Sequence, residues 1–330
     1  MVCRRWGAGV LALGLAACSD DGVAASGSGS STSALTAGPD AGATSGDDSA
    51  SASEGGSTAG SGPAGSGMGT SVPTGASEGT SGTTETGGRD AIWQPAPGTS
   101  WQWQLVGDID TSVDVAVYDI DLFDAPQAII DALHADGRSV ICYFSAGSYE
   151  EWRDDADAFP AAAIGEPLDG WPGEAWLDHR DASIRAIMQA RLDVALAKGC
   201  DAVEPDNVDG YINDTGFALT ADEQLDYNRF LASEAHARGL SIGLKNDVDQ
   251  VGALLDDFDW ALNEECVAYQ ECQTLSPFID QGKAVFHVEY VDDTAQGPGL
   301  AEQVCPQTTA LGFSTLIKEW DLTIWRLPCE

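Results

Sequence analysis

The chain has 330 residues, of which 53 are acidic and 15 basic, so its formal net charge is −38. This excess of negative charge argues against nucleic acids and anionic membrane surfaces as partners, because both repel an acidic protein. It is compatible with a cationic substrate, and equally with a surface that is acidic only for solubility or salt tolerance.

Residues 1–18 have the layout of a secretory signal. Arg4 and Arg5 precede an uncharged, mostly apolar stretch that is too short to cross a bilayer as a permanent helix. The stretch ends in the tetrad Leu-Ala-Ala-Cys at residues 15–18, which resembles the bacterial lipobox, whose cysteine carries a lipid. We therefore expect an exported protein anchored to a membrane by a lipid on Cys18. An ordinary signal peptide and free secretion are the alternative.

Residues 19–88 consist almost entirely of Ser, Gly, Ala and Thr, with eight acidic residues and no basic or aromatic ones. Such a segment cannot bury enough apolar surface to fold. A Gly/Ser-rich coil of this length has an end-to-end distance of roughly 45 Å. We expect a disordered tether that holds a domain away from a membrane.

Residues 89–330 contain all but one of the ten tryptophans and have a length that suits one large folded domain. Six cysteines fall in this domain, and an even number in an exported protein favours disulfides. Cys266 with Cys272 would close a short loop, and Cys305 with Cys329 would tie down the C-terminus. The remaining two, at 142 and 200, are either buried thiols or a third bridge. No CxxC pair or spaced histidine pair indicates a metal site, and no cofactor is expected.

Short apolar runs, rich in β-branched residues, recur through this domain and predict strands. They are 101–105, 115–118, 139–144, 201–203, 241–244, 260–262, 284–288 and 314–317.

Helix-length amphipathic segments separate most of these runs. The segments 126–135, 181–198 and 221–238 each stop at a glycine, a common residue at helix ends. Thr220 with Glu223 matches a capping box, which places a helix start there. Eight strands alternating with helices predict an α/β fold of the (β/α)8 TIM-barrel type. The first β/α unit can be irregular, because 106–114 is too short and too polar for a crossover helix.

Carboxylates follow most of the predicted strands at the same end. The densest group is EPDNVDGY at 204–211, where Pro205 stops strand pairing and leaves the acids on a loop. In barrel enzymes that end of the strands carries the chemistry. Two positioned carboxylates without a histidine, serine or metal partner indicate glycoside hydrolysis, in which one acid protonates the leaving oxygen and the other attacks the sugar or activates water.

Eight motifs in order along residues 91–329 together resemble glycoside hydrolase family 114. They are WQWQL (101–105), YDIDLFD (118–124), VICYFSAGSYEEWR (140–153), WPGEAWLD (171–178), GCDAVEPDNVDGY (199–211), GLKND (243–247), NEEC (263–266) and GKAVFHVEY (282–290).

The resemblance implies a TIM-barrel endo-α-1,4-polygalactosaminidase whose substrate is a cationic, galactosamine-containing polysaccharide. It assigns the catalytic pair to Asp206 and Glu264. The more common form of the second motif is NEQC, so Glu265 adds a carboxylate beside Glu264, and strand alternation allows only one of the two to face the cleft. We expect Asp206 to be the nucleophile and Glu264 the general acid/base, with the reverse assignment open.

We also expect substrate-binding residues around the rim where the strands end, and a protein that acts as a monomer. The candidates are Tyr118, Asp119, Asp121, Tyr143, Glu204, Asp209, Tyr211, Lys245, Asn246 and Glu289. Two other functions fit the sequence: an inactive carbohydrate-binding protein on a barrel scaffold, and a glycosidase for a different amino sugar polymer.

Overall fold

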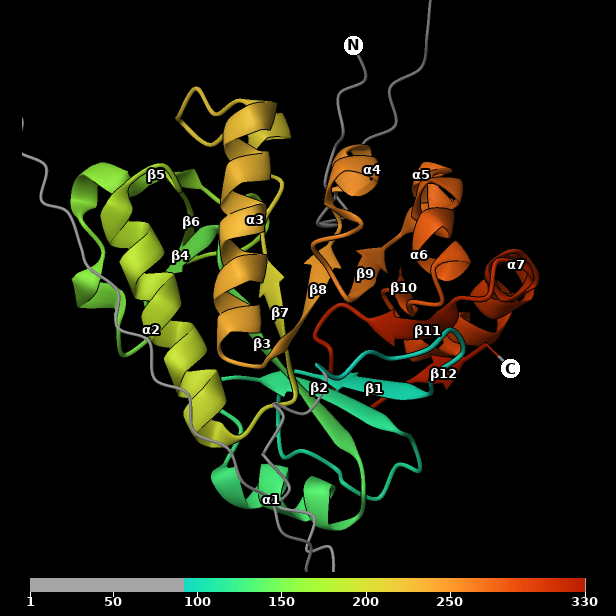
Figure 1. The fold of residues 1–330 in the computed structure, drawn as a ribbon. Coiled ribbons are helices and arrows are strands. Elements are labelled where there is room, and N and C mark those ends of the chain that lie inside the picture. Colours follow the sequence, from blue (N-terminus) through green and yellow to red (C-terminus); the bar gives the residue numbers. More distant parts are fainter. Residues whose placement is uncertain (1–91, 330) are drawn as a thin grey trace, which may run out of the picture. The chain divides into compact units, whose positions relative to one another are not determined.

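A computed structural model describes residues 92–329, and within them eight parallel strands curl into a barrel-like sheet (Figure 1). The predicted TIM-type fold is confirmed, with its strands in sequence order around the sheet. The strands are β1 (Trp101–Gln104), β2 (Val117–Asp121), β3 (Ser139–Ser145), β7 (Ala202–Asp206), β8 (Ser241–Lys245), β9 (Trp260–Glu264), β10 (Val285–Val291) and β11 (Ser314–Glu319), followed by an antiparallel β12 (Leu327–Pro328).

Hydrogen bonds join the first strand to the region of the last. The Trp101 indole N–H donates to the Ser314 carbonyl oxygen at 2.9 Å, and the Leu105 N–H donates to the Leu322 carbonyl oxygen at 3.0 Å. The segment between β1 and β2 contains no helix within the described chain, which is the irregular first unit that its length predicts.

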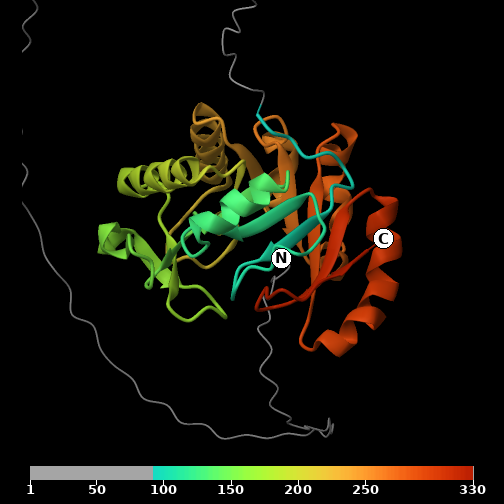
Figure 2. The same cartoon turned by 90° about the horizontal axis from the view of Figure 1, so that it is seen from below.

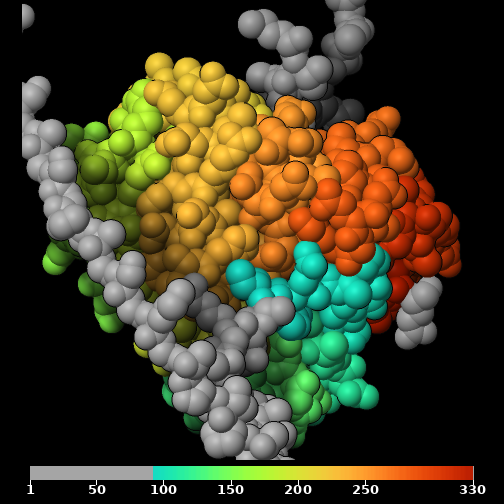
Figure 3. All heavy atoms as spheres, viewed as in Figure 1, coloured from blue at the N-terminus to red at the C-terminus, as the bar shows by residue number. Residues whose placement is uncertain are grey.

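Helices connect the later strands and cover the outside of the sheet. In the space-filling view (Figure 3), the residues that come after α3 in the chain lie against this helix. Helix α7 packs on β11 (Figure 2). The α-helices are α1 (Gln127–Ala135), α2 (Ala182–Lys198), α3 (Ala221–Ala237), α4 (Val251–Leu254), α5 (Cys266–Tyr269), α6 (Ser276–Asp280) and α7 (Gly297–Ala310). The 3₁₀ turns are η1 (Ala156–Ala158), η2 (Ala161–Ala163), η3 (Gly210–Ile212), η4 (Val248–Gln250), η5 (Cys272–Leu275) and η6 (Thr294–Gln296).

Local sequence explains the ends of the long helices. The side chains of Thr220 and Glu223 exchange hydrogen bonds with each other's backbone N–H, which is the predicted capping box at the start of α3. Helix α2 ends at Gly199, whose φ of 78° is left-handed and costs glycine little.

A three-stranded antiparallel sheet, which the sequence did not predict, follows β3 at its carboxyl end. It comprises β4 (Ser148–Glu150), β5 (Ile164–Pro167) and β6 (Glu174–Leu177), in the order β4-β6-β5 (Figure 1). We call residues 148–177 the insert.

The barrel interior changes from apolar to charged along the strands. Trp101, Trp260 and Phe286 pack together inside the sheet, with ring centroids 4.7 and 5.4 Å apart. Gly243 makes room for them, because a Cβ there would lie 2.4 Å from the Trp260 ring. Beyond these three rings, which we call the aromatic plug, Leu262 and Val288 are still apolar, and the acids and Lys245 follow toward the carboxyl ends of the strands.

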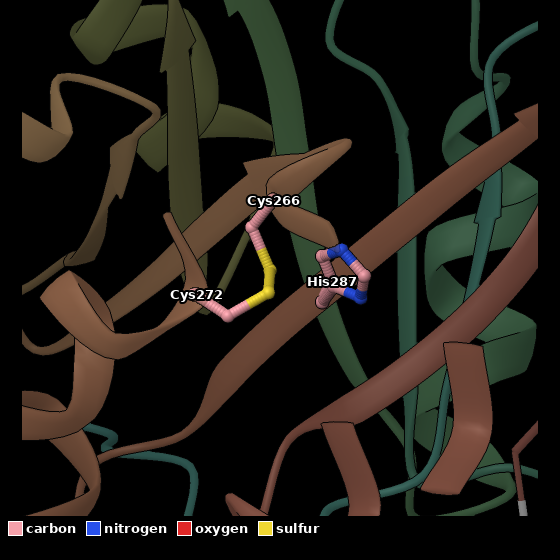
Figure 4. Close-up of side chains that lie close together, drawn as sticks. All are labelled: Cys266, Cys272 and His287. Carbon is pink, nitrogen blue, oxygen red and sulfur yellow. A yellow bond between two sulfur atoms is a disulfide. The ribbon is translucent and has the colours of Figure 1, made fainter. Parts of the chain in front are cut away.

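Three disulfides form, and they are typical of exported proteins. The expected pairs Cys266–Cys272 and Cys305–Cys329 are confirmed, and Cys142–Cys200 is the third bridge. His287 lies beside the Cys266–Cys272 bridge (Figure 4), where both sulfurs are already bonded to each other.

The predicted signal, the lipidation site Cys18 and the tether at 19–88 lie outside the described residues. Among the helices of residues 92–329, none is both long enough and apolar enough to cross a bilayer.

Candidate active site

Three carboxylates surround one buried ammonium group at the carboxyl ends of β7, β8 and β9. The Lys245 Nζ atom lies 2.8 Å from Glu204 Oε1, 3.3 Å from Asp206 Oδ1 and 3.5 Å from Glu264 Oε2. Its side chain is only 2% exposed and its ammonium lies 4.5 Å from the centre of the Trp103 ring. Burial opposes the charge, but the surrounding carboxylates outweigh it and hold the pKa of Lys245 well above its usual range.

Strand periodicity produces this arrangement. Residues two apart on a strand face the same side, so Glu204 and Asp206 both point into the barrel from β7. The adjacent strands β8 and β9 present Lys245 and Glu264 at their last positions. In the ladder Lys245 pairs with Leu262, which faces the same side as Glu264 two residues later.

Asp206 receives further hydrogen bonds. The Tyr143 hydroxyl donates to Oδ2 at 3.0 Å, and the Asn207 backbone N–H donates to Oδ1 at 2.8 Å. Asn207 has a left-handed φ of 60°, which bends the chain so that its N–H reaches back to the preceding side chain. The Asp206 side chain is 18% exposed, so part of it stays open to a ligand.

Glu264 is held from two other strands. The Tyr290 hydroxyl of β10 donates to Oε1 at 2.5 Å, and the Asn246 amide after β8 donates to Oε2 at 3.0 Å. Burial keeps the pKa of Tyr290 well above its usual range, and the Glu264 charge raises it further, so the phenol stays a donor. The Glu264 side chain is 14% exposed, comparable to Asp206.

The structure answers which glutamate of the NEEC motif joins this group. Glu264 is the last residue of β9 and points inward, whereas Glu265 has a left-handed φ of 60° and begins the turn into α5. Burial raises the pKa of Glu265 to about 7, and the charges of Glu289 and Glu264 add to the effect.

The two expected catalytic carboxylates are close enough to act on one bond. One oxygen of Asp206 and one of Glu264 each lie within 3.5 Å of the same Lys245 nitrogen, so these oxygens are at most about 7 Å apart. Pairs of carboxyl groups in glycosidases are separated by roughly 5 to 9.5 Å.

A fifth member of the cluster, Asp119 on β2, is completely buried beside Glu204. Burial raises the pKa of Asp119 well above its usual range, and the neighbouring Glu204 carboxylate raises it further. Two carboxyl groups can share a hydrogen bond only if one carries a proton. Burial also raises the pKa of Glu204, to about 7, while Lys245 acts to lower it, so we place that proton on Asp119.

Burial separates the expected substrate contacts. Asp119 and Glu204 are fully buried and Lys245 is 2% exposed, whereas Asp206 and Glu264 are partly exposed. We therefore propose that the first three support the site from within the barrel.

Three other candidates make contacts outside the group around Lys245. Tyr118 is on the outward face of β2, in the core, where its hydroxyl donates to the carbonyl oxygens of Asp110 and Val113. Asp121 is committed to a buried ion pair with Arg153, at 2.7 Å. Glu289 faces outward from β10.

The surroundings of Glu289 show its role. Its Oε1 atom accepts the Val267 backbone N–H of α5 at 2.7 Å and lies 3.2 Å from His287 Nε2. This carboxylate therefore fixes the loop of the Cys266–Cys272 disulfide. The sequence analysis ends its second strand at Tyr118, but β2 runs from Val117 to Asp121, so Tyr118 lies near the start of the strand. Glu289 lies inside β10, between the inward residues Val288 and Tyr290.

Asp209 and Tyr211 belong to a second polar group, next to the first along the rim. They lie around Asp247, whose pKa is raised to about 9 by burial and by the Asp209 charge. Asn228 donates to Asp247 Oδ2 at 2.9 Å, which ties this group to α3.

Glu174 on the insert is a candidate residue that the sequence reasoning missed. It accepts the Ser148 hydroxyl at 2.6 Å, and the Asn207 amide reaches the same hydroxyl at 3.4 Å. Burial raises the pKa of Glu174 to about 7, with contributions from Glu150 and Asp206. Its motif, WPGEAWLD, is visible in the sequence, but nothing local predicts that β6 folds back to the catalytic loop.

The buried proton predicts how stability depends on pH. The folded pKa of Asp119 is above its unfolded value, so its contribution to the free energy of unfolding is complete at low pH and is lost as the pH rises through the folded pKa. Asp119→Asn keeps a donor toward Glu204 but does not titrate. We expect its free energy of unfolding to fall less steeply than that of the wild type from about pH 4 upward, as measured by urea denaturation.

Two further variants complete this test. Asp131→Asn, an exposed acid on α1, should keep the wild-type slope. Glu204→Gln removes the carboxylate nearest to the Lys245 ammonium and should lower the free energy of unfolding by about 3 to 5 kcal/mol. An unchanged slope in Asp119→Asn would show that Asp119 is ionised in the folded protein.

Comparisons with known proteins identify the family of the chain. Residues 82–330 match the model of glycoside hydrolase family GH114. The crystal structure of Aspergillus fumigatus Ega3 in complex with galactosamine is similar to the chain with a TM-score of 0.70 and 47% sequence identity, covering 72% of this chain and 98% of that one.

Two more distant relatives share the fold or part of the sequence. The glycoside hydrolase domain of PelA from Pseudomonas aeruginosa has a TM-score of 0.56 at 13% identity, covering 69% of this chain and 97% of that domain. An uncharacterised protein of Deinococcus radiodurans is 26% identical over 232 residues, 64% of this chain and 73% of its own length. The family model spans most of the chain, and the chain is a glycoside hydrolase that belongs to family GH114.

Proposed function

We propose that the protein is an endo-acting hydrolase of α-1,4-linked, galactosamine-containing polysaccharide, with Asp206 and Glu264 as its catalytic pair. The observation that supports this most strongly is the convergence of two partly exposed carboxylates on Lys245. The 47% identical Ega3, solved with galactosamine, supports the choice of sugar.

The charges of the site favour a cationic sugar. Lys245 supplies one positive charge to the carboxylates of Glu204, Asp206 and Glu264, so the cluster remains negative. An unacetylated amino sugar carries an ammonium group, which this negative potential attracts and orients.

Each carboxylate has a distinct role in the proposed reaction. Asp206 attacks the anomeric carbon and forms a glycosyl ester, while Glu264 donates its proton to the departing glycosidic oxygen. Water then attacks the same carbon, gives its proton to Glu264 and releases Asp206.

The neighbouring residues prepare both groups. Lys245, Tyr143 and the Asn207 N–H stabilise the anionic form of Asp206. Tyr290 and Asn246 hold Glu264 in place. Among the remaining rim candidates, Tyr143, Asn246, Asp209 and Tyr211 are the ones we propose near the substrate.

Acid-to-amide variants test the assignment. Asp206→Asn and Glu264→Gln should each lower the release of oligosaccharides from a deacetylated galactosamine polymer by about 100- to 10,000-fold, because each removes one proton-transfer or nucleophilic group. Asp131→Asn, the same change on the outside of α1, should keep wild-type activity.

The same assay separates the alternatives. Binding of the polymer by the wild type without cleavage would favour a carbohydrate-binding protein. Cleavage of chitosan in place of the galactosamine polymer would favour a different amino sugar substrate. Full activity of either amide variant would remove that residue from the proposed pair.

We further propose that the enzyme is exported and acts as a monomer tethered to a membrane through a lipid on Cys18 and the linker at 19–88. The lipobox-like tetrad supports the anchor, and the three disulfides support export.

Fractionation of expressing bacteria tests the anchor. The full chain should sediment with membranes, and Cys18→Ser should lose the lipid and move to the soluble or secreted fraction. A Cys3→Ser variant, which leaves the tetrad intact, should stay with the membranes. Soluble wild-type protein would contradict lipid anchoring and favour free secretion.

A further inference from the structure

Two tryptophans on the insert expose about half of their surface. Trp152 is 53% exposed and Trp171 is 48% exposed, whereas Trp101, Trp103 and Trp260 in the same domain are buried. Tryptophan is one of the largest apolar side chains, and leaving two of them open on one small element forgoes a substantial gain from burial.

Both tryptophans lie at one end of the β4–β6 ladder. Trp152 follows β4 by two residues, and Trp171 stands in the turn before β6. The backbone connects the two turns, because the Glu151 N–H donates to the Gly173 carbonyl oxygen at 3.1 Å and the Glu174 N–H donates to the Trp171 carbonyl oxygen at 3.1 Å.

Gly173 is required at the centre of this surface. Its φ of 94° is one that other residues rarely adopt. A Cβ at this position would lie 3.1 Å from the Trp152 ring and 3.0 Å from Glu151 Oε1. The ring and the carboxylate therefore both lie against the bare α-carbon of the glycine, and they are neighbours.

The carboxylate of Glu151 has no ionic partner within residues 92–329, and it is exposed. The preceding residue, Glu150, is by contrast buried, and its Oε1 atom lies 2.7 Å from Arg153 Nη2. Trp152, Trp171 and Glu151 thus form an exposed surface of two aromatic rings and one free negative charge, which we call the tryptophan surface.

This surface continues from the catalytic loop. Asp206 accepts the Asn207 N–H, the Asn207 amide reaches Ser148 Oγ, and Ser148 donates to Glu174. Gly173 is the residue before Glu174. Strand β6 and the turn before it therefore carry both Glu174, which reaches the catalytic loop, and the tryptophan surface.

We propose that the tryptophan surface is an outer subsite that binds a further galactosamine residue of the polymer, beyond those held at the catalytic pair. It rests on the proposed function. The apolar C–H face of a sugar ring packs on an indole, an ammonium group is attracted to the same ring face, and Glu151 supplies the opposite charge. A neutral sugar would make only the packing contact between its C–H face and the indole.

The proposal is tested with chains of two lengths. Trp152→Ala and Trp171→Ala should each lower kcat/KM on the long galactosamine polymer by about two- to fivefold, the effect of one exposed cation–π contact, mainly through a higher KM. The loss on the polymer should exceed the loss on the shortest oligomer that the wild type cleaves, because that oligomer does not reach the insert.

Leu196→Ala serves as the matched control. Leu196 is 49% exposed on the outer side of α2, so its removal also deletes exposed apolar surface, and its kinetics on both substrates should equal those of the wild type. Glu151→Gln should weaken binding of the deacetylated polymer and make that binding less sensitive to salt.

A binding measurement gives a second readout. In the Glu264→Gln background, the deacetylated polymer should change the tryptophan fluorescence, and the change should be smaller after Trp152→Ala and Trp171→Ala. Equal losses on the short and long substrates, or no loss on either, would overturn the outer subsite while leaving the catalytic assignment intact. A wild type inactive on both substrates would instead contradict the proposed function.

Discussion

Lys245 ends β8 with its side chain inside the barrel, where its ammonium lies within 3.5 Å of three carboxylates. A buried charge of either sign is costly alone, so neither the lysine nor the acids would be stable there without the others. The ammonium allows carboxylates from β7 and β9 to approach each other closely. The aromatic plug beneath it excludes water from below and keeps these interactions strong.

The number of charges also links the fold to the substrate. The cluster contains four carboxyl groups and one ammonium, and the proton that we place on Asp119 leaves a net negative site. Protonation of Glu264 would reduce the net negative charge of the cluster by one. The ammonium group of a bound amino sugar would offset the negative charge that remains. Outside the cluster, Glu174 lies beside the catalytic loop and Glu151 adds an exposed carboxylate. The proposed preference for a cationic polymer rests on this excess of buried acids over lysine.

The sequence predicts the barrel because each strand and each long helix carries a local signal, such as the capping box at Thr220 or the glycine after α2. It also predicts that acids gather at one end of the strands. The sequence does not show which acids are buried and which are accessible to a ligand. Glu204 and Asp206 point the same way from β7 and differ only in solvent exposure. Nor does the sequence predict the insert, whose strands are only three or four residues long and pair with one another. The sequence analysis expects Tyr118 and Glu289 to bind substrate at the rim, whereas in the structure both side chains face outward from their strands.

A crystal structure of the Glu264→Gln variant with a defined α-1,4-linked galactosamine oligomer tests the central claim most directly. The account predicts that the oligomer crosses the ends of β7 and β9, with one anomeric carbon about 3 to 3.5 Å from an Asp206 oxygen and its glycosidic oxygen beside residue 264. It would be contradicted by an oligomer bound elsewhere on the barrel, or by one whose anomeric carbons all lie beyond the reach of Asp206 while Lys245 still holds its carboxylates.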